Sequence, residues 1–331
     1  MFRYPVSWTR FTWLSLLLVP LSWLFRTAVA VRRSWYKAGL LRSERLPVPV
    51  IVVGNISVGG TGKTPLVIWL VSRLREAGYN PGIVSRGYGG TATGVCAVHA
   101  TDEPARCGDE PVLLARRTNC PVWIGRDRVA AARALLDTNP GCNVIVSDDG
   151  LQHYRLARNA EIAVVDGARG LGNGWMLPAG PLREPPSRLS EVDAVAVRAP
   201  VVQSIQTVPP QYAMTLESAG LRNLHDAGRC VDASHFKGLR VHAIAGIGNP
   251  QQFFDTLTRL GIAHKAHAFA DHHAFSATDL TYSDCDALVM TEKDAVKCER
   301  YAADTHWVLQ VNAHVDDALA NVVLERIKRK R

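Results

Sequence analysis

A cluster of glycines followed by a lysine and a threonine stands between residues 57 and 64 of the chain. Glycines at this spacing let backbone N–H groups close on phosphate oxygens, while the lysine reaches the β- and γ-phosphates and the threonine hydroxyl meets Mg²⁺. The residues with this pattern are Ser57, Val58, Gly59, Gly60, Thr61, Gly62, Lys63 and Thr64. The usual pattern has a glycine where this chain has Ser57, and the glycines that follow supply the flexibility instead. The segment therefore predicts a phosphate-binding loop for a nucleoside triphosphate, with phosphoryl transfer as the expected chemistry.

Two aspartates, Asp148 and Asp149, come directly after the apolar run from Val144 to Ser147. An apolar strand that ends in aspartate is a second element of phosphoryl-transfer sites, where the carboxylate holds Mg²⁺ directly or through water. Asp-Asp-Gly after a strand is also a common turn sequence. Because Lys63 and Thr64 lie upstream, we expect the two aspartates to lie near the metal.

Two weaker signals come later in the chain. Asp294 ends the segment Thr291 to Asp294, which is similar to the base-recognition segment of some phosphate-loop proteins, although an exposed turn explains it equally well. His272 and His273 follow Asp271, and neighbouring residues on a strand point to opposite faces, so the two histidines cannot both bind one metal ion from a strand. A base that acts on a substrate hydroxyl is the better hypothesis for this group, and a pair of surface histidines is the alternative.

Regular elements must position these side chains. Val48 to Val53 is a β-branched run without alternation, which is typical of a strand buried on both faces, and Pro65 to Ala77 has the pattern of a helix. Further apolar runs predict strands at 82–84, 122–124, 143–147, 162–165 and 194–197. Repeated alternation of strands and helices predicts an α/β fold of the P-loop NTPase type, with a mostly parallel sheet flanked by helices.

The strand and helix pattern weakens between residues 201 and 235, where Pro209 and Pro210 interrupt a polar stretch. A second α/β pattern follows, with strands expected at 240–245 and 287–290 and a helix at 251–260. We therefore predict a membrane-associated N-terminal helix at 1–36, a P-loop kinase domain at 37–200, a linker at 201–235 that could be two-stranded, and a smaller C-terminal α/β domain at 236–331.

The N-terminal region leaves the pattern of a soluble protein, because Phe11 to Phe25 is almost wholly apolar and lies between Arg10 and Arg26. A spanning helix needs about 20 apolar residues, and this run is shorter and contains Pro20, so a helix that lies in the membrane interface is the preferred interpretation. A spanning helix and a buried core helix stay open as alternatives. We reject a secretory signal, because the phosphate loop needs ATP, which the cytosol supplies.

Charge and cysteine content narrow the class of partner. The 331 residues carry a formal net charge of +8, which suits nucleic acid, an anionic membrane surface or a phosphorylated substrate. No aromatic-studded basic stripe for stacking bases is evident, so we expect no nucleic-acid partner. The seven cysteines form no C-x-x-C pair, which argues for a reducing compartment and against a zinc site. A nucleotide-driven switch that binds a partner protein is the alternative of another functional class.

Further blocks accompany these motifs in a specific order. They are S-R-G-Y in 84–88, G-D-E-P at 108–111, D-G-L-Q-H at 149–153, D-G-A-R-G-L-G-N-G at 166–174 and L-P-A-G-P-L-R-E-P at 177–185. In order and spacing the chain resembles the tetraacyldisaccharide 4'-kinases, the lipid A 4'-kinases of Gram-negative bacteria. The resemblance covers nearly the whole chain, and the last two blocks are its most specific part. Ser57 is shared with that family.

The resemblance implies transfer of the γ-phosphate of ATP, with Mg²⁺, to the 4'-hydroxyl of a tetraacyldisaccharide 1-phosphate, giving lipid IVA. It places the protein at the cytoplasmic face of the inner membrane, bound to a surface of anionic lipid, and we expect a monomer. The roles that it implies are Asp109 with His272 and Lys63 in catalysis, Asp148, Asp149, Thr64 and Glu184 near Mg²⁺, and Arg86, Tyr88, Arg128 and Arg183 toward the substrate.

Overall fold

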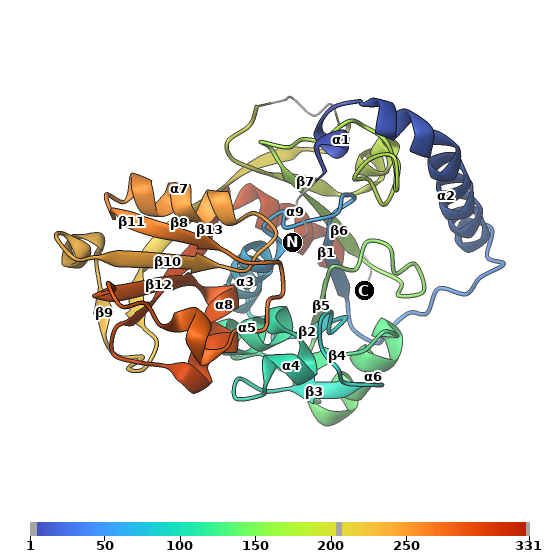
Figure 1. Cartoon of the computed structure of the whole chain (residues 1–331). Helices are drawn as coiled ribbons and strands as arrows, with labels where there is room; N and C mark the ends of the chain where they lie inside the picture. The colour runs from blue at the N-terminus through green and yellow to red at the C-terminus, as the bar shows by residue number, and fades with distance from the viewer. Residues whose placement is uncertain (1–4, 203–206, 329–331) are drawn as a thin grey trace.

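The computed structural model describes residues 5–202 and 207–328 of the chain. The strands in these residues form one mixed sheet (Figure 1). The strands are β1 (Val50–Gly54), β2 (Pro81–Ser85), β3 (Cys96–Val98), β4 (Val122–Ile124), β5 (Val144–Asp148), β6 (Ala160–Asp166), β7 (Ala194–Arg198), β8 (Gln211–Asn223), β9 (Cys230–Val231), β10 (Val241–Ala245), β11 (His264–Ala268), β12 (Ala287–Thr291) and β13 (His306–Val315). Their order is β11-β10-β12-β13-β8-β7-β6-β1-β5-β2-β4-β3, with β9 paired to β8.

Most neighbouring strands run parallel, as expected from the sequence. Strand β1 lies between β5 and β6 and pairs in parallel with both. Among the named strands of the described part of the chain, the antiparallel pairs are β3 with β4, β8 with β9, and β8 with β13. Since the carboxyl ends of parallel strands meet at one edge of a sheet, the segments that follow β1, β2 and β5 lie close together. The phosphate loop and Asp148 therefore share an edge.

Strand β8 connects the two α/β patterns. It lies inside the segment 201–235, where we expected a linker, and it is 13 residues long. It pairs in parallel with β7 and in antiparallel with β13, so it joins the sheet of the phosphate loop to the strands of the second pattern. Residues 203–206 of that segment lie outside the described residues. The division of the chain into four parts stays a proposal.

Helices cover both faces of the sheet. The described α-helices are α1 (Val6–Thr9), α2 (Trp13–Lys37), α3 (Lys63–Glu76), α4 (Pro104–Cys107), α5 (Asp109–Thr118), α6 (Arg128–Thr138), α7 (Pro250–Arg259), α8 (Glu292–Cys298) and α9 (Ala318–Lys328). Leu70 of α3, Val112 of α5 and Val323 of α9 share one hydrophobic cluster with the strands around β1. Leu135 of α6 belongs to the cluster on the opposite face. Burial on both faces explains why these strands lack alternation.

Helix α2 lies along the outside of the molecule, at the right of Figure 1. It begins at a capping box in which Thr12 and Ser15 satisfy each other's backbone N–H groups. Its buried residues are Ser15 and Ser22, and Phe25 and Val29 are half-buried against the core, whereas most of its other large apolar side chains face outward, with Trp13 75% and Leu24 71% exposed. This is the reverse of a helix that packs on a soluble core. By length and composition alone, α2 could also cross a membrane.

Candidate active site

The phosphate loop connects the carboxyl end of β1 to the start of α3. Gly59 and Gly62 have φ of 104° and 93°, a conformation that side chains with a Cβ rarely adopt. Gly62 is the residue before Lys63, the first residue of α3, so the loop ends at a helix N-terminus, where backbone N–H groups favour anions. Ser57 forms a short antiparallel bridge with Leu182, an extended conformation open to any residue. The missing first glycine is therefore explained by its position.

Cations and carboxylates surround the mouth of the loop. Lys63 Nζ lies 3.5 Å from Asp149 Oδ1, and Arg183 Nη1 lies 3.0 Å from Asp149 Oδ2. Arg128, which is buried, places Nη2 3.5 Å from the carbonyl oxygen of Asp149. The hydroxyl of Ser85 donates to Asp148 Oδ2 at 3.3 Å. The structure therefore brings four of the predicted residues, Lys63, Asp149, Arg128 and Arg183, into one group.

The two neighbouring aspartates have opposite electrostatic environments. Burial would raise the pKa of Asp149, but Lys63 and Arg183 outweigh it and hold that pKa below its ordinary value. Burial, together with the negative charges of Glu110 and Asp149, raises the pKa of Asp148. Asp148 Oδ1 is buried and has no hydrogen-bond partner. An unpaired buried carboxylate oxygen beside a phosphate loop fits a bound cation, which would supply the missing partner.

A second group of charges forms around Asp109, the first residue of α5. Asp109 Oδ2 lies 3.0 Å from His272 Nδ1, and Lys293 Nζ lies 3.9 Å from the same oxygen. Lys293 also contacts Glu110 at 3.1 Å and Asp271 at 3.5 Å. The ring of Tyr88 packs on the ring of His272, with 5.2 Å between centroids. The structure therefore joins the predicted pair Asp109 and His272 and adds Lys293.

The pKa of Asp109 is lowered and the pKa of His272 is raised, as expected for an ion pair. Burial would raise the pKa of Asp109, but the hydrogen bond from His272 and the charge of Lys293 outweigh it and lower that pKa. The hydrogen bond to Asp109 raises the pKa of His272 above its ordinary value. A carboxylate that holds an imidazole in one orientation is suited to position a hydroxyl group and to accept its proton.

The two groups meet at the phosphate loop. A Cβ at Gly248, in the loop after β10, would lie 3.3 Å from the backbone nitrogen of Gly60 and 3.4 Å from Asp271 Oδ2. Asp271 in turn contacts Lys293, and both Asp271 and His272 lie in the segment after β11. The second α/β pattern therefore brings its charged residues to the edge of the sheet where the phosphate loop lies. Glycine at position 248 permits this close approach.

Three predicted residues have other surroundings. Arg86 is exposed directly after β2. Glu184 is buried, and its carboxylate accepts hydrogen bonds from Tyr154 and Gln152. Asp294 is fully buried and accepts hydrogen bonds from the backbone of Gly246 at 3.0 Å and from Thr291 Oγ1 at 2.7 Å, which stabilises the start of α8. The expected roles of all three stay predictions.

Sequence reasoning missed several polar residues of this site. Lys293 and Gln152 lie inside segments singled out above, 291–294 and 149–153, but no role was assigned to them. Asn55, directly after β1, is fully buried and donates from Nδ2 to Thr61 Oγ1 at 3.2 Å. The spacing of the glycine motif does not single out Asn55. Its position directly after a strand of buried residues could have indicated a buried polar residue of the site.

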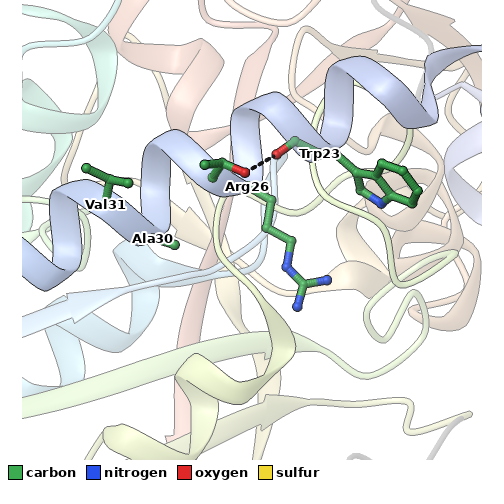
Figure 2. Close-up of a pocket in the computed structure, with 5 residues that line it drawn as sticks. Trp23, Arg26, Ala30 and Val31 are labelled. Atoms are coloured by element: carbon green, nitrogen blue, oxygen red, sulfur yellow. Dashed lines mark hydrogen bonds between the residues drawn. The ribbon is translucent and has the colours of Figure 1, made fainter.

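Helix α2 has an open pocket on its surface, lined by Trp23, Arg26, Thr27, Ala30 and Val31 (Figure 2). A second pocket lies between α2 and the two specific blocks of the sequence, with Trp23 and Arg26 on one side and Trp175 and Pro186 on the other. Ser22 Oγ donates to the carbonyl oxygen of Met176 at 2.8 Å and attaches the helix there. Met176 directly precedes the L-P-A-G-P-L-R-E-P block, which continues from there to Arg183 and Glu184.

Comparisons with known proteins agree with this geometry. The family model described as tetraacyldisaccharide-1-P 4'-kinase matches residues 14–328. A tetraacyldisaccharide 4'-kinase from Aromatoleum aromaticum is 52% identical over 330 residues, which cover 99% of this chain and 98% of that protein. One from Azoarcus sp. is 53% identical over 322 residues, or 96% of this chain and 93% of that protein.

Similarity extends to a solved structure. The "apo" form of LpxK from Aquifex aeolicus in complex with ATP superposes with a TM-score of 0.82 at 29% sequence identity, over 95% of this chain and 99% of that chain. Because the family model matches residues 14–328 and relatives about 50% identical cover nearly the whole chain, the chain belongs to the tetraacyldisaccharide-1-P 4'-kinase family.

Proposed function

We propose that the protein transfers the γ-phosphate of ATP to the 4'-hydroxyl of a tetraacyldisaccharide 1-phosphate, which gives the 4'-phosphorylated lipid A precursor, lipid IVA. The observation that carries this proposal is the meeting of Asp109 and His272 with the phosphate loop at one edge of the sheet. Membership of the 4'-kinase family supports the acceptor, and the similar ATP-bound structure supports the nucleotide.

The nucleotide is expected at the phosphate loop. Backbone N–H groups of residues 57–64 and the N-terminus of α3 surround the phosphates, while Lys63 neutralises charge on the γ-phosphoryl oxygens as the acceptor approaches. Asp294 stays the proposed contact of the base. Arg128 and Arg183, which like Lys63 contact Asp149, would add positive charge near the phosphates.

Mg²⁺ is the proposed metal, held by Thr64, Asp148 and Asp149, with Glu184 as a less direct contributor. When bound, it would neutralise phosphate charge and align the transferred group. Among the described residues, no three His, Cys, Asp or Glu side chains form a complete metal cluster. This fits Mg²⁺, which binds through one or two carboxylates together with phosphate oxygens and water rather than in a cage of protein ligands.

The acceptor hydroxyl is expected at Asp109 and His272. Because Asp109 is buried and holds His272 Nδ1 at 3.0 Å, the pair has one orientation and can accept a proton late in the transfer. Tyr88, whose ring packs on His272, and Arg86 are the proposed contacts of the sugar. Positioning and charge neutralisation account for most of the catalysis of phosphoryl transfer, and this site offers both.

The outward apolar face of α2 supports attachment to the cytoplasmic face of a membrane that contains anionic lipid. Trp13, Leu17 and Leu24 are each more than half exposed, which is costly in water and favourable at the interface of a bilayer. The acyl chains of the substrate would then stay in the bilayer while its sugar reaches the site. We also propose that the protein is a monomer and that its chain is divided into the four parts predicted from the sequence.

A transfer assay tests the proposed function. Purified protein with Mg²⁺, ATP labelled at the γ-phosphate and the disaccharide 1-phosphate should give label on the 4' position. The control is Lys63→Ala, which removes the charge on the γ-phosphoryl group. Transfer no greater than that of the control would contradict the proposal.

A further inference from the structure

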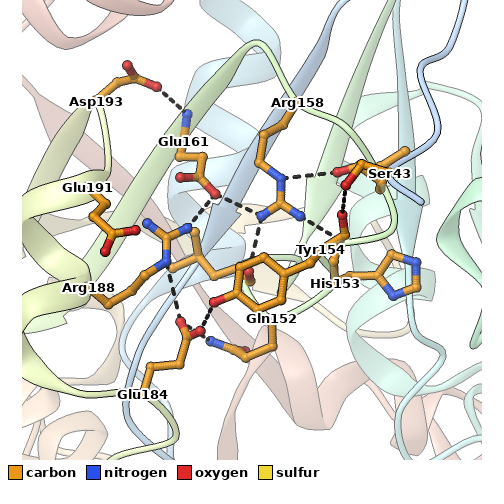
Figure 3. Close-up of polar contacts among 12 residues, drawn as sticks. Ser43, Gln152, His153, Tyr154, Arg158, Glu161, Glu184, Arg188, Glu191 and Asp193 are labelled. Atoms are coloured by element: carbon orange, nitrogen blue, oxygen red, sulfur yellow. Dashed lines mark hydrogen bonds and ion pairs between the residues drawn. The ribbon is translucent and has the colours of Figure 1, made fainter. Parts of the chain in front are cut away.

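Glu184 sits at the centre of a buried polar network, shown in Figure 3. The hydroxyl of Tyr154 donates to Oε1 of its carboxylate, and Gln152 Nε2 donates to Oε2 at 3.2 Å. Arg188 Nε lies 3.6 Å from Oε2, and Arg188 is itself held by Glu161. A buried carboxylate with partners on every side has a fixed position, because moving it would leave a charged group without hydrogen bonds.

From Glu184 the network continues to the phosphate loop. The same Gln152 Nε2 donates to the carbonyl oxygen of Asn55 at 3.0 Å. Asn55 Nδ2 then donates to Thr61 Oγ1 at 3.2 Å, inside the loop. The backbone of Arg183, next to Glu184, donates to the carbonyl oxygen of Ile56 at 2.7 Å, while its side chain binds Asp149. A displacement of Glu184 therefore affects both the phosphate loop and the guanidinium of Arg183, which binds Asp149.

In the other direction the network reaches helix α2. The ring of Tyr154 packs on Tyr36, with 5.8 Å between centroids, and the guanidinium of Arg33 lies 6.0 Å from the centroid of Tyr154. Arg33 is fixed by an ion pair of 2.6 Å with Glu191. Burial raises the pKa of the Tyr154 hydroxyl, so that hydroxyl stays a hydrogen-bond donor at working pH. Tyr154 is thus the residue where contacts from α2 and contacts to Glu184 meet.

We propose that Tyr154 is a positioning residue that couples the seating of helix α2 to the geometry of the phosphate loop. When α2 is in place, Arg33 and Tyr36 hold the ring, the hydroxyl holds Glu184, and Gln152 transmits that position to Asn55 and Thr61. When α2 shifts, the ring loses Arg33 and Tyr36 while it keeps the guanidinium of Arg158, 5.5 Å from its centroid, and the loop relaxes. Measurements of kcat and KM for this proposal rest on the proposed kinase function, whereas a measurement of amide hydrogen exchange in the phosphate loop does not.

The first experiment removes only the hydroxyl. Tyr154→Phe keeps the ring that packs on α2, and it should lower kcat by about tenfold, the effect expected for the loss of one hydrogen bond to a charged partner. The KM for the lipid should change by less than about twofold, since Tyr154 contacts neither Asp109 nor His272, where the acceptor hydroxyl is expected. Tyr301→Phe, at a half-buried tyrosine in another hydrophobic cluster, is the matched control and should leave both constants unchanged. A wild-type kcat for Tyr154→Phe would overturn the proposal.

The second experiment tests whether α2 acts through that hydroxyl. Arg33→Met should lower kcat at saturating lipid by about two- to fivefold, the range for a lost cation–π contact. In the Tyr154→Phe background the same change should have no further effect, because the route is already broken. Arg32→Met removes an equal charge from an exposed neighbour on α2 and should leave kcat unchanged. Equal effects of Arg33→Met in both backgrounds would show that α2 acts by another route.

The third experiment needs no catalysis. Amide hydrogen exchange of residues 55–64 is compared for full-length protein on vesicles of phosphatidylethanolamine and phosphatidylglycerol and for protein free in solution. In wild-type protein these amides should exchange more slowly on vesicles than in solution. In Tyr154→Phe they should exchange at the same rate on vesicles and in solution. The same vesicle protection in Tyr154→Phe as in wild type would overturn the coupling. Absence of phosphoryl transfer in the wild type would instead contradict only the proposed function.

Discussion

Asp109 and His272 are 163 positions apart in the sequence, yet Asp109 Oδ2 and His272 Nδ1 lie 3.0 Å apart. One residue starts helix α5, which packs on β3 and β4, and the other follows β11 at the opposite end of the sheet order. The pair therefore exists only when both α/β patterns are folded and in contact. Its formation completes the candidate site.

Removing either member of this pair should reduce turnover strongly. Asp109→Asn and His272→Ala are each expected to lower kcat by about a hundredfold or more, the usual scale for the loss of a general base. His273→Ala is the control, because His273 lies next in the chain but contacts Asp279 instead. Initial rates of γ-phosphate transfer measure the effect, and near-normal turnover in either variant would remove that residue from the proposed role.

The same pair predicts a pH dependence of stability. The pKa of His272 is raised above its ordinary value of 6.5, so its contribution is complete below about pH 6.5 and is lost as pH rises through the folded-state value. The pKa of Asp109 is lowered below 3.8, so its contribution is complete above about pH 4 and is lost as pH falls.

The free energy of unfolding of wild type minus that of His272→Gln should therefore be largest between about pH 4 and pH 6.5 and should shrink toward pH 9. Chemical denaturation at a series of pH values measures it. A difference that grows above pH 7 would mean that neutral His272 is the form stabilised by folding.

Asp148 should be needed for the metal. Asp148→Asn replaces the unpaired carboxylate oxygen by an amide and is expected to raise the Mg²⁺ concentration for half-maximal transfer by about tenfold or more. Asp137→Asn, at an exposed position of α6, removes the same charge as a control. Titration of Mg²⁺ at saturating ATP provides the measurement, and an unchanged midpoint would exclude Asp148 from the metal site.

The exposed face of α2 should control membrane binding without affecting the fold. Replacing Trp13, Leu17 and Leu24 together by serine should abolish sedimentation with vesicles, while the affinity for ATP stays within about twofold of wild type. Stability should change by less than about 0.5 kcal/mol per substitution, because these side chains are exposed. Val208→Ser, at an apolar residue 87% exposed elsewhere, is the control. Undiminished sedimentation would exclude this face as the anchor.

Gly172 should be necessary for attachment of the N-terminal segment. A Cβ there would lie 2.4 Å from the carbonyl oxygen of Trp8, and φ is +62°. Gly172→Ala is expected to lower the free energy of unfolding by about 1–3 kcal/mol. Gly174→Ala is a close control, since Gly174 has φ of +78° but open space around its Cβ position. Equal losses in the two variants would assign the cost to backbone conformation rather than to contact with Trp8.

Much of the fold followed from local pattern. The strand predicted at 122–124 matches β4, and the runs at 143–147 and 194–197 match β5 and β7 to within one residue at each end. These strands are buried on both faces, and such runs are conspicuous in sequence. Helix α3 begins at Lys63, two residues before the predicted Pro65, because the phosphate loop itself starts the first turn.

Other parts depended on contacts that local pattern does not reveal. The two strands considered possible in 201–235 correspond to β8 and β9, but the 13-residue length of β8 and its pairing with β7 and β13 join segments that local pattern does not connect. The contacts of Lys293 with Glu110 and Asp271 likewise depend on folding of the whole chain. For Glu184, the motif indicated a polar site residue, but only its surroundings reveal the donors Tyr154 and Gln152.

Helix α9 follows every other described element in the chain, yet it packs on β1, β6 and α3. Leu319, Val323 and Ile327 fill the hydrophobic cluster beneath the phosphate loop. During synthesis, the N-terminal half leaves the ribosome with that apolar surface uncovered and cannot complete its core until residues 318–328 have emerged. Helix α2, by contrast, is available to a membrane from the start. With α2 attached as proposed, a nascent chain would thus reach the bilayer before it could hold a nucleotide.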